Sequence, residues 1–319
     1  YSLYVGIPFC PSICLYCSFS SYPLKQWKKR VDQYLDALCK ELAYIGKVSS
    51  EKKLNTIYIG GGTPTSLDAE QLDQILTCID QSFSREHLLE YTVEAGRPDS
   101  ITEKKLQVIK RHGVTRISIN PQTMQQKTLD RIGRKHSVQE VKDIYRMARK
   151  LGFDNINMDL IAGLPGEGLE DMKDTLAQIQ ELAPDSLTVH SLAVKRASKL
   201  SQWIEEKGIS MLNNTEETMK IAMEGAKQLR MVPYYLYRQK NMSGNFENVG
   251  YATEGNFGIY NILIMEEKQT IVALGAGSIT KRVFPDGRIE RCDNVKDVAL
   301  YIEKIDEMIE RKKRLLEEK

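Results

Sequence analysis

The feature that most limits the fold is a regular alternation of strand-like and helix-like segments. Six short β-like runs are predicted to be strands: 3–9, 56–60, 91–95, 116–120, 155–160 and 186–192. Runs with helical periodicity lie between them: 32–45, 69–83, 103–113, 139–152 and 169–182. Strands that alternate with helices build βαβ units around a parallel sheet. We therefore predict an α/β fold in which residues 1–200 form a partial, TIM-like (β/α)6 barrel.

The pattern changes after residue 200, and residues 201–319 are predicted to form a smaller C-terminal α+β region. Within it, 215–229 has helical periodicity, and 260–275 is typical of a hairpin of antiparallel strands. The charged segment 295–319 is predicted to be an amphipathic helix with a solvated face. A helix that binds a partner is the alternative for this segment.

Three of the six cysteines, Cys10, Cys14 and Cys17, lie within eight positions in a CxxxCxxC pattern after the first predicted strand. Disulfides are strained at such spacing, and the four scattered histidines do not supply the further ligands that zinc usually has. Three close thiolates instead suit an iron–sulfur cluster, and a four-iron cubane would keep one iron open to a substrate or cofactor. The other three are isolated and are interpreted as buried small apolar residues: Cys39, Cys78 and Cys292.

Polar and glycine-rich segments follow the other predicted strands, at the end of a parallel sheet where chemistry collects. In residues 60–66, three glycines beside a threonine allow backbone amides to approach a ligand, although a tight turn is the alternative. The Walker lysine is missing, which argues against a phosphate loop. The carboxylates of Glu94 and Asp159 suit ribose hydroxyls, with structural ion pairs as the alternative. Other polar residues expected on this rim are Asn120, Gln122, Arg134, His190 and Ser191.

Composition argues against two classes of protein. A formal net charge of +2 indicates neither an acidic tail nor a general nucleic-acid-binding surface. No run approaches 18 apolar residues, so no membrane span is expected. With 319 residues, of which 41% are hydrophobic, the chain can bury a substantial core. The sequence begins at Tyr1 inside a β-like run, and we expect a native segment to precede it.

Four segments together resemble the radical S-adenosylmethionine (SAM) superfamily: YVGIPFCPSICLYCSF (4–19), YIGGGTPTSL (58–67), INMDLIAGLPGE (156–167) and VALGAGS (272–278). Within the superfamily they are similar to the oxygen-independent coproporphyrinogen III dehydrogenase group. The stretch VPYYLYRQKNMSGNFENVGYA (232–252) resembles the HemZ-type branch of that group. The similarity covers nearly the whole chain, and it implies a radical SAM barrel whose C-terminal region covers the substrate.

The resemblance implies that Cys10, Cys14 and Cys17 hold a [4Fe-4S] cluster, whose fourth iron takes the amino and carboxylate groups of SAM. It places one or two SAM molecules at eleven positions: Tyr4, Tyr16, Gly61, Gly62, Thr63, Glu94, Gln122, Arg134, Asp159, Ala193 and Ile279. It assigns no catalytic residue. Possible substrate contacts are Arg97, Lys195, Arg196 and the aromatic segment with Tyr234, Tyr235, Tyr237, Arg238 and Lys240.

The activity implied by the resemblance is oxidative decarboxylation of the propionates of coproporphyrinogen III to vinyl groups through a 5′-deoxyadenosyl radical. Its setting would be a reducing cytoplasm, with a tetrapyrrole substrate and a reduced flavodoxin- or ferredoxin-type electron donor. Two alternatives stay open: a radical methyltransferase that uses two SAM molecules, and a non-enzymatic protein that binds or delivers haem.

Two departures from the family pattern bear on these alternatives. Gly255 and Asn261 stand where haem chaperones have the histidine and the tryptophan of an HNxxYW motif, which counts against haem ligation in that mode. Residues 94–98 read EAGRP, where the dehydrogenases usually have a glutamate, an aliphatic residue, Asp, Pro and Arg.

Overall fold

Six parallel strands in chain order form the centre of the computed structural model, which describes residues 1–17, 22–194, 198–208, 212–238, 244 and 246–317. They are β1 (Ser2–Ile7), β4 (Thr56–Gly61), β5 (Glu90–Gly96), β6 (Arg116–Ile119), β7 (Ile156–Ala162) and β8 (Ser186–Ser191). Each pairs in parallel with the next. A separate two-stranded sheet joins β2 (Phe9–Cys10) to β3 (Tyr22–Pro23). The predicted α/β class and partial barrel are confirmed.

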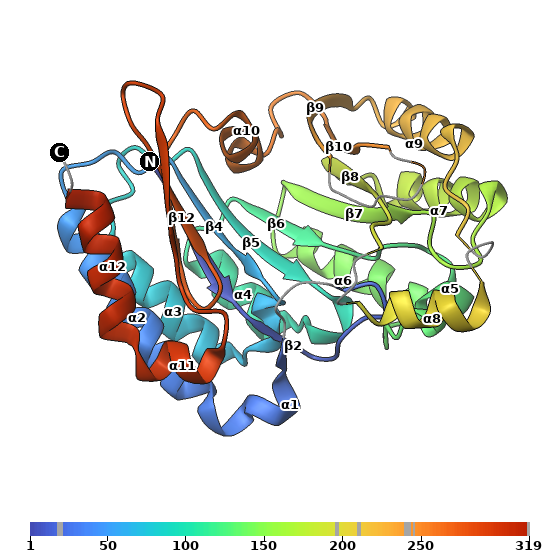
Figure 1. Ribbon diagram of the computed structural model, residues 1–319. Helices are drawn as coiled ribbons and strands as arrows, with labels where there is room; N and C mark the ends of the chain where they lie inside the picture. Colours follow the sequence, from blue (N-terminus) through green and yellow to red (C-terminus); the bar gives the residue numbers. More distant parts are fainter. Residues whose placement is uncertain (18–21, 195–197, 209–211, 239–243, 245, 318–319) are drawn as a thin grey trace.

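Helices connect these strands and cover the outer side of the curved sheet (Figure 1). The long ones match the predicted segments: α2 (Val31–Val48), α3 (Ala69–Ser82), α4 (Glu103–Arg111), α6 (Val138–Lys150) and α7 (Leu169–Leu182). Two short helices are α1 (Leu24–Trp27) and α5 (Gln126–Arg131). Capping boxes at Asp68 and Ser137 begin α3 and α6, because each side chain accepts a hydrogen bond from an otherwise unpaired backbone amide. The core lies between these helices and the sheet.

The C-terminal region extends both edges of the same sheet. On one edge, β11 (Ile271–Leu274) pairs in parallel with β1 and continues into the antiparallel strands β12 (Ile279–Val283) and β13 (Ile289–Asp293). On the other, β10 (Asn248–Ala252) and β9 (Val232–Tyr237) follow β8 in antiparallel order. The remaining helices are α8 (Lys199–Lys207), α9 (Glu216–Gln228), α10 (Ile259–Glu266), α11 (Val298–Glu303) and α12 (Ile305–Glu317). Residues 201–319 therefore share one sheet with the barrel strands.

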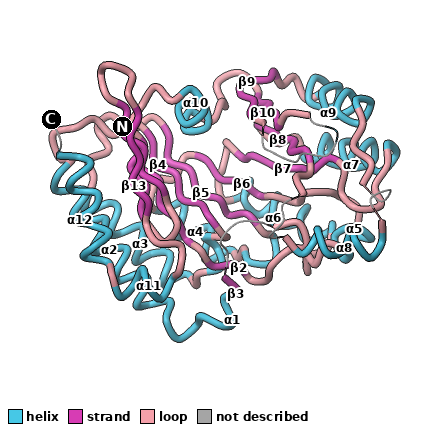
Figure 2. Tube along the Cα trace, in the orientation of Figure 1, coloured by secondary structure: helices cyan, strands magenta, loops and turns pink. Residues whose placement is uncertain are grey.

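One prediction for this region is wrong, and the predicted C-terminal helix is interrupted once. The expected antiparallel hairpin at 260–275 is instead the helix α10 followed by β11, which is parallel to its neighbour. Because α10 is apolar on nearly all sides, its sequence shows no helical period. Figure 2 shows α10 between β4 and β9, and it contacts both strands. The carboxylate of Glu90 accepts hydrogen bonds from the amides of Ile259 (2.6 Å) and Tyr260 (3.3 Å), and so caps the helix from β5. The charged C-terminal segment is divided into α11 and α12 at Lys304.

Across the described residues, none of the helices combines the length and the apolar character that a membrane span requires.

A disulfide between Cys39 and Cys78 joins α2 to α3, with 5.8 Å between the two Cα atoms. The interpretation of both residues as isolated thiols is wrong, because the packing of α2 against α3 brings together cysteines that are 39 positions apart. Cys292 is a free, half-buried thiol on β13.

The disulfide is expected to raise the free energy of unfolding of the oxidised protein. Closing a loop of 39 residues lowers the entropy of the unfolded chain, which corresponds to about 4 kcal/mol at 25 °C in the loop-closure description. Urea unfolding of the oxidised protein and of the C39S/C78S variant measures the difference, with C292S as the control for a cysteine outside the disulfide. A difference no larger than that of the control would contradict the prediction.

Candidate functional site

A cavity of about 850 Å³ lies on the concave inner side of the sheet and is lined by strand ends, by the loops that follow them and by α10. It brings together the three predicted cluster ligands and every predicted SAM position except Ile279: Cys10, Cys14, Cys17, Tyr4, Tyr16, Gly61, Gly62, Thr63, Glu94, Gln122, Arg134, Asp159 and Ala193. The strands β1, β4, β5 and β7 and the loops after β6 and β8 all contribute to this set. Parallel strands end at one rim, which explains how residues so far apart in the sequence meet.

The cysteine loop is held to the barrel by backbone hydrogen bonds. The amide of Leu15 donates to Ile132 O (3.0 Å), and the amide of Leu200 donates to Leu15 O (2.9 Å). Cys10 and Cys14 are buried, and Cys10 Sγ lies 3.4 Å from Thr63 Oγ1. Burial raises the pKa of the Cys10 thiol to about 11, although the hydrogen bond with Thr63 acts to lower this pKa. Metal binding at this loop would therefore release a proton from Cys10.

The donor set of this loop fits a cubane cluster better than a single ion. Within the described part of the chain, no three His, Cys, Asp or Glu side chains converge as the ligands of one metal ion would. A [4Fe-4S] cluster binds each thiolate on a different iron, so the three sulfurs need not converge. None of the three cysteines is in a disulfide and all three line the same cavity, which meets the requirement for such a cluster.

The glycine turn after β4 packs against the backbone of β1 and β2. The amides of Gly62 and Thr63 donate to Ile7 O (2.7 Å) and Phe9 O (2.8 Å), and the amide of Gly61 bonds to Glu94. A Cβ atom on Gly62 would lie 2.6 Å from Phe9 O, so only glycine fits there. These amides already have partners inside the protein, and the role of the turn in ligand binding stays a prediction.

Glu94 and Tyr58 form a half-buried hydrogen-bonded pair on the wall of the cavity. The Tyr58 hydroxyl donates to Glu94 Oε1. Burial raises the pKa of Glu94 to about 7, and the charge of Asp159 adds to this effect, while the hydrogen bonds from Tyr58 and Gly61 oppose it. Near neutral pH the carboxyl group is therefore close to the midpoint of its titration. Tyr58 was not predicted from the sequence, since a tyrosine in an apolar strand carries no distinguishing signal.

Asp159 is held by its neighbours on β7 and β8. Asn157 Nδ2 donates to Asp159 Oδ1 (2.7 Å), and His190 Nε2 lies 3.6 Å from Asp159 Oδ2. Burial acts to raise the pKa of Asp159, but hydrogen bonds with His190 and Asn157 outweigh it and hold the pKa below its usual value. On its other side, His190 Nδ1 lies 3.2 Å from the Tyr237 hydroxyl. The carboxylate therefore stays charged and oriented toward the cavity.

Gln122 and Arg134 fix the part of the rim after β6. Gln122 has φ 70°, which is uncommon for a residue other than glycine, and its backbone pairs with Asp159 O (2.9 Å) and the Ile161 amide (2.9 Å). Strained backbone of this kind concentrates at functional sites. Arg134 donates to Asn120 O (2.6 Å) and to the Tyr16 hydroxyl (3.0 Å). Its Nε atom is buried without a partner among the described residues, which leaves one donor for a ligand.

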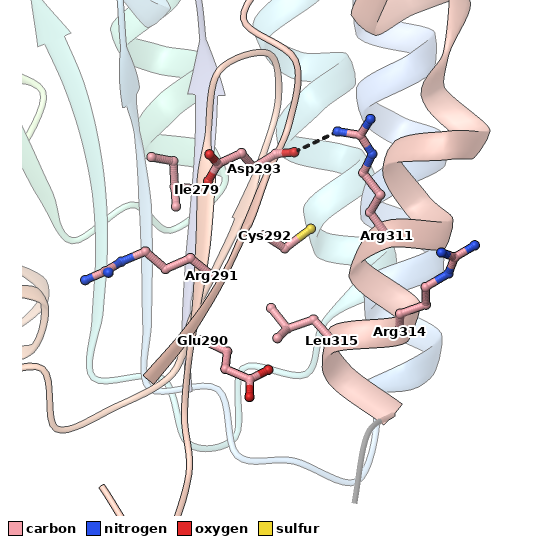
Figure 3. A pocket seen from close by; sticks show the side chains of 8 residues that line it. All are labelled: Ile279, Glu290, Arg291, Cys292, Asp293, Arg311, Arg314 and Leu315. Atoms are coloured by element: carbon pink, nitrogen blue, oxygen red, sulfur yellow. Dashed lines mark hydrogen bonds between the residues drawn. The ribbon is translucent and has the colours of Figure 1, made fainter. Parts of the chain in front are cut away.

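Ile279 does not lie with the other predicted SAM residues. It is the first residue of β12, is 47% exposed and lines a shallow groove between the β12–β13 hairpin and α12. Figure 3 shows it beside Cys292 and Asp293. The motif at 272–278 thus ends in a turn, and the strand that follows directs Ile279 into this outer groove.

Of the residues considered for substrate contacts, some line the cavity and others do not. Tyr235 and Tyr237 line the cavity, whereas Tyr234 is outside its lining and stacks on Phe257, with 5.3 Å between ring centroids. Arg238 pairs with Glu247. Arg97 lines the cavity but is bound to the cysteine loop. Lys195, Arg196 and Lys240 lie outside the described residues.

The partial barrel thus has a three-cysteine loop at one rim, beside a cavity to which many polar side chains contribute. The sequence profile described as "Radical SAM superfamily" matches residues 4–179, which is more than half of the chain. The chain therefore belongs to the radical SAM superfamily.

Three similar proteins place the chain more narrowly. It is 44% identical, over 99% of its length, to "Oxygen-independent coproporphyrinogen-III oxidase-like protein HemZ" of Bacillus subtilis (strain 168), of which it spans 64%. It is 38% identical, over 61% of its length, to "Heme chaperone HemW" of the same organism, of which it spans 51%. Coproporphyrinogen III oxidase (HemN) from Escherichia coli has the same fold, with a TM-score of 0.75 and 22% identity over 97% of this chain and 69% of that one. The chain thus spans about half to two thirds of the curated relatives named here.

Proposed function

We propose that the protein is a radical SAM oxidoreductase that decarboxylates propionate side chains of coproporphyrinogen III to vinyl groups. The observation that carries the proposal is one continuous cavity that reaches from the three cysteines to the stacked tyrosines of β9. The similarity to an oxidase-like relative over 99% of the chain supports the tetrapyrrole substrate. A cytoplasmic setting and a reduced flavodoxin- or ferredoxin-type electron donor are part of the same proposal.

The residues of the cavity would have distinct roles. When bound, the cluster and SAM supply a carbon-centred radical that removes one hydrogen atom from the propionate chain. The substrate radical then loses CO2 and transfers one electron to an external one-electron acceptor, and a vinyl group remains. Glu94 and Asp159 would hold SAM through its hydroxyl groups, and the Arg134 Nε atom offers a further donor. Burial of these groups excludes water from the reacting carbon.

The tyrosines of β9 would contact the tetrapyrrole. Tyr235 and Tyr237 are parallel to within 3°, with 6.3 Å between ring centroids, and both line the cavity. Their rings offer a flat surface to a macrocycle, and phenol hydroxyls can donate hydrogen bonds to carboxylates. The same cavity is lined by the cysteine loop, so a macrocycle on these tyrosines would share it with the cluster.

A haem-binding or haem-delivery protein is the second candidate, because one of the relatives is named a heme chaperone. The position of Gly255 argues against the HNxxYW mode of haem ligation. Gly255 has φ 85°, which a histidine would adopt only at a cost of about 1–2 kcal/mol.

Anaerobic turnover tests the proposal. The cluster is reconstituted and reduced, SAM and coproporphyrinogen III are added, and both are followed by mass spectrometry. Losses of about 46 Da per propionate, from CO2 and two hydrogens, with 5′-deoxyadenosine rising in step, are the expected result. SAM cleavage with an unchanged tetrapyrrole overturns the substrate assignment. In that case, S-adenosylhomocysteine would indicate methyl transfer, and stable binding of haem would indicate haem handling.

A further inference from the structure

Arg97 lines the cavity, but the roles proposed above for the cavity residues give it no function. It follows β5 directly after a shift in the register between β5 and β6, at Glu94 and Gly96. Gly96 has φ 68°, a conformation that favours glycine, and the chain turns there. The Arg97 side chain is thereby directed at the cysteine loop, and the residue is only 3% exposed.

The guanidinium group of Arg97 binds the cysteine loop through one nitrogen. Its Nη1 atom donates to Ser12 O (2.9 Å) and Ser12 Oγ (2.9 Å), and lies 3.5 Å from Cys14 Sγ. The loop is thus held at both its backbone and one of its three predicted cluster ligands. No helix or strand of the loop itself supplies this constraint, because Ser12 and Cys14 lie between β2 and the end of the described segment at residue 17.

The opposite edge of the guanidinium is held by Asp99. Arg97 Nε and Nη2 donate to Asp99 Oδ1 (2.9 Å) and Asp99 Oδ2 (2.7 Å), which is the bidentate geometry that fixes an arginine plane. The Asp99 side chain is 15% exposed, so the pair is largely shielded from water. Because both edges are occupied, Arg97 has little capacity left for a substrate carboxylate, and the expected propionate contact is not supported.

We propose that Arg97, oriented by Asp99, is a positioning residue for the iron–sulfur cluster. It shapes the cysteine loop for cluster binding and sets the reduction potential of the cluster through the N–H···S hydrogen bond to Cys14. The inference does not depend on the substrate in the proposed function, because it concerns only the cluster ligands and the residues that touch them.

The physical basis is the charge of the reduced cluster. Reduction adds an electron, so a hydrogen-bond donor or a positive charge beside a ligand sulfur favours the reduced state and raises the potential. The Asp99 carboxylate has the opposite effect, since it partly neutralises the guanidinium. Removal of Arg97 and removal of the charge of Asp99 should therefore move the potential in opposite directions.

An EPR-monitored redox titration of the reconstituted protein, with iron measured per chain, tests the proposal. For R97M we expect a lower midpoint potential and less iron retained. For D99N, which keeps the side-chain shape and removes the charge, we expect a higher potential. R97K keeps the positive charge but not the bidentate geometry, and its potential should lie between those of wild type and R97M.

The pair Arg149 and Asp185 provides the matched control. Arg149 Nη2 lies 2.7 Å from Asp185 Oδ2, and neither residue lines the cavity, so R149M and D185N should leave the potential unchanged. A purely structural role for Arg97 would lower the iron content in R97M and D99N alike, with no shift in the potential of the remaining cluster. Unchanged potentials, or shifts of both variants in the same direction, overturn the proposal. If R97M does not fold, D99N and R97K still decide it.

Discussion

Replacing Cys10, Cys14 or Cys17 by alanine is expected to abolish the reductive cleavage of SAM by the reconstituted protein. Each of the three cysteines lines the cavity outside any disulfide, and a cubane held by only two protein ligands has a second open corner. We expect a fall in rate of at least about a thousandfold, which corresponds to about 4 kcal/mol of transition-state stabilisation. The measurement is 5′-deoxyadenosine formed per chain under anaerobic reduction.

Cys292 supplies the control for this substitution. Among the described residues it is the fourth cysteine outside the disulfide, and it lies on β13, in the groove between the hairpin and α12. C292A is the same substitution, cysteine to alanine, at a position outside the cavity. Iron content and SAM cleavage should therefore stay at the wild-type level. If one of the three loop variants retained full iron content and cleavage, the assignment of the cluster ligands would be wrong.

The rim of the barrel could be predicted because it depends on local signals. Each polar candidate, from the cysteines to His190, follows a recognisable strand, and parallel strands place their ends at one edge. The same reasoning could not show that the amides of Gly62 and Thr63 are already paired, because their acceptors, Ile7 and Phe9, are more than 50 positions away. Local sequence indicates which residues face the rim, and only the fold shows which of their groups are still unpaired.

Other features are invisible in the sequence for related reasons. The disulfide joins two helices whose cysteines have no local pattern in common. The helix α10 is capped by Glu90, which lies 169 positions earlier on β5, so its own sequence contains no start signal. Arg97 appeared in the sequence as a departure from the family pattern, but its contact with Cys14 follows from a register shift in the sheet. In each case the deciding interaction is between segments that are distant in the chain.

The C-terminal helix contains the clearest example of such a hidden interaction. Lys312 lies in the charged segment predicted to be an amphipathic helix, and its side chain is fully buried, with Nζ 2.7 Å from Glu41 Oε1 and bonded to Asn294 Oδ1. Glu41 is also fully buried and accepts hydrogen bonds from the Tyr301 hydroxyl (2.6 Å) and the Gly275 amide (2.9 Å). This network fastens α12 to α2 and to the turn after β11.

Replacing Lys312 by methionine is therefore expected to lower the free energy of unfolding by about 3–5 kcal/mol, because Glu41 is left as a buried charge without its cation. The double variant E41Q/K312M should cost clearly less than K312M alone, since glutamine keeps hydrogen-bonding capacity and removes the charge. Lys40, on the same helix as Glu41, is the matched control.

The Lys40–Asp306 ion pair is about as short as the Lys312–Glu41 pair, but it lies at the surface. Lys40 Nζ lies 2.6 Å from Asp306 Oδ1, with the two side chains 53% and 78% exposed, so K40M should cost at most about 1 kcal/mol. Urea denaturation of the four proteins gives the comparison. If K312M and K40M were equally destabilised, burial of the Lys312–Glu41 pair would not be what holds the C-terminal helix. If only K312M loses much unfolding free energy, and E41Q/K312M recovers part of it, the unpaired charge of Glu41 is the cause of the destabilisation.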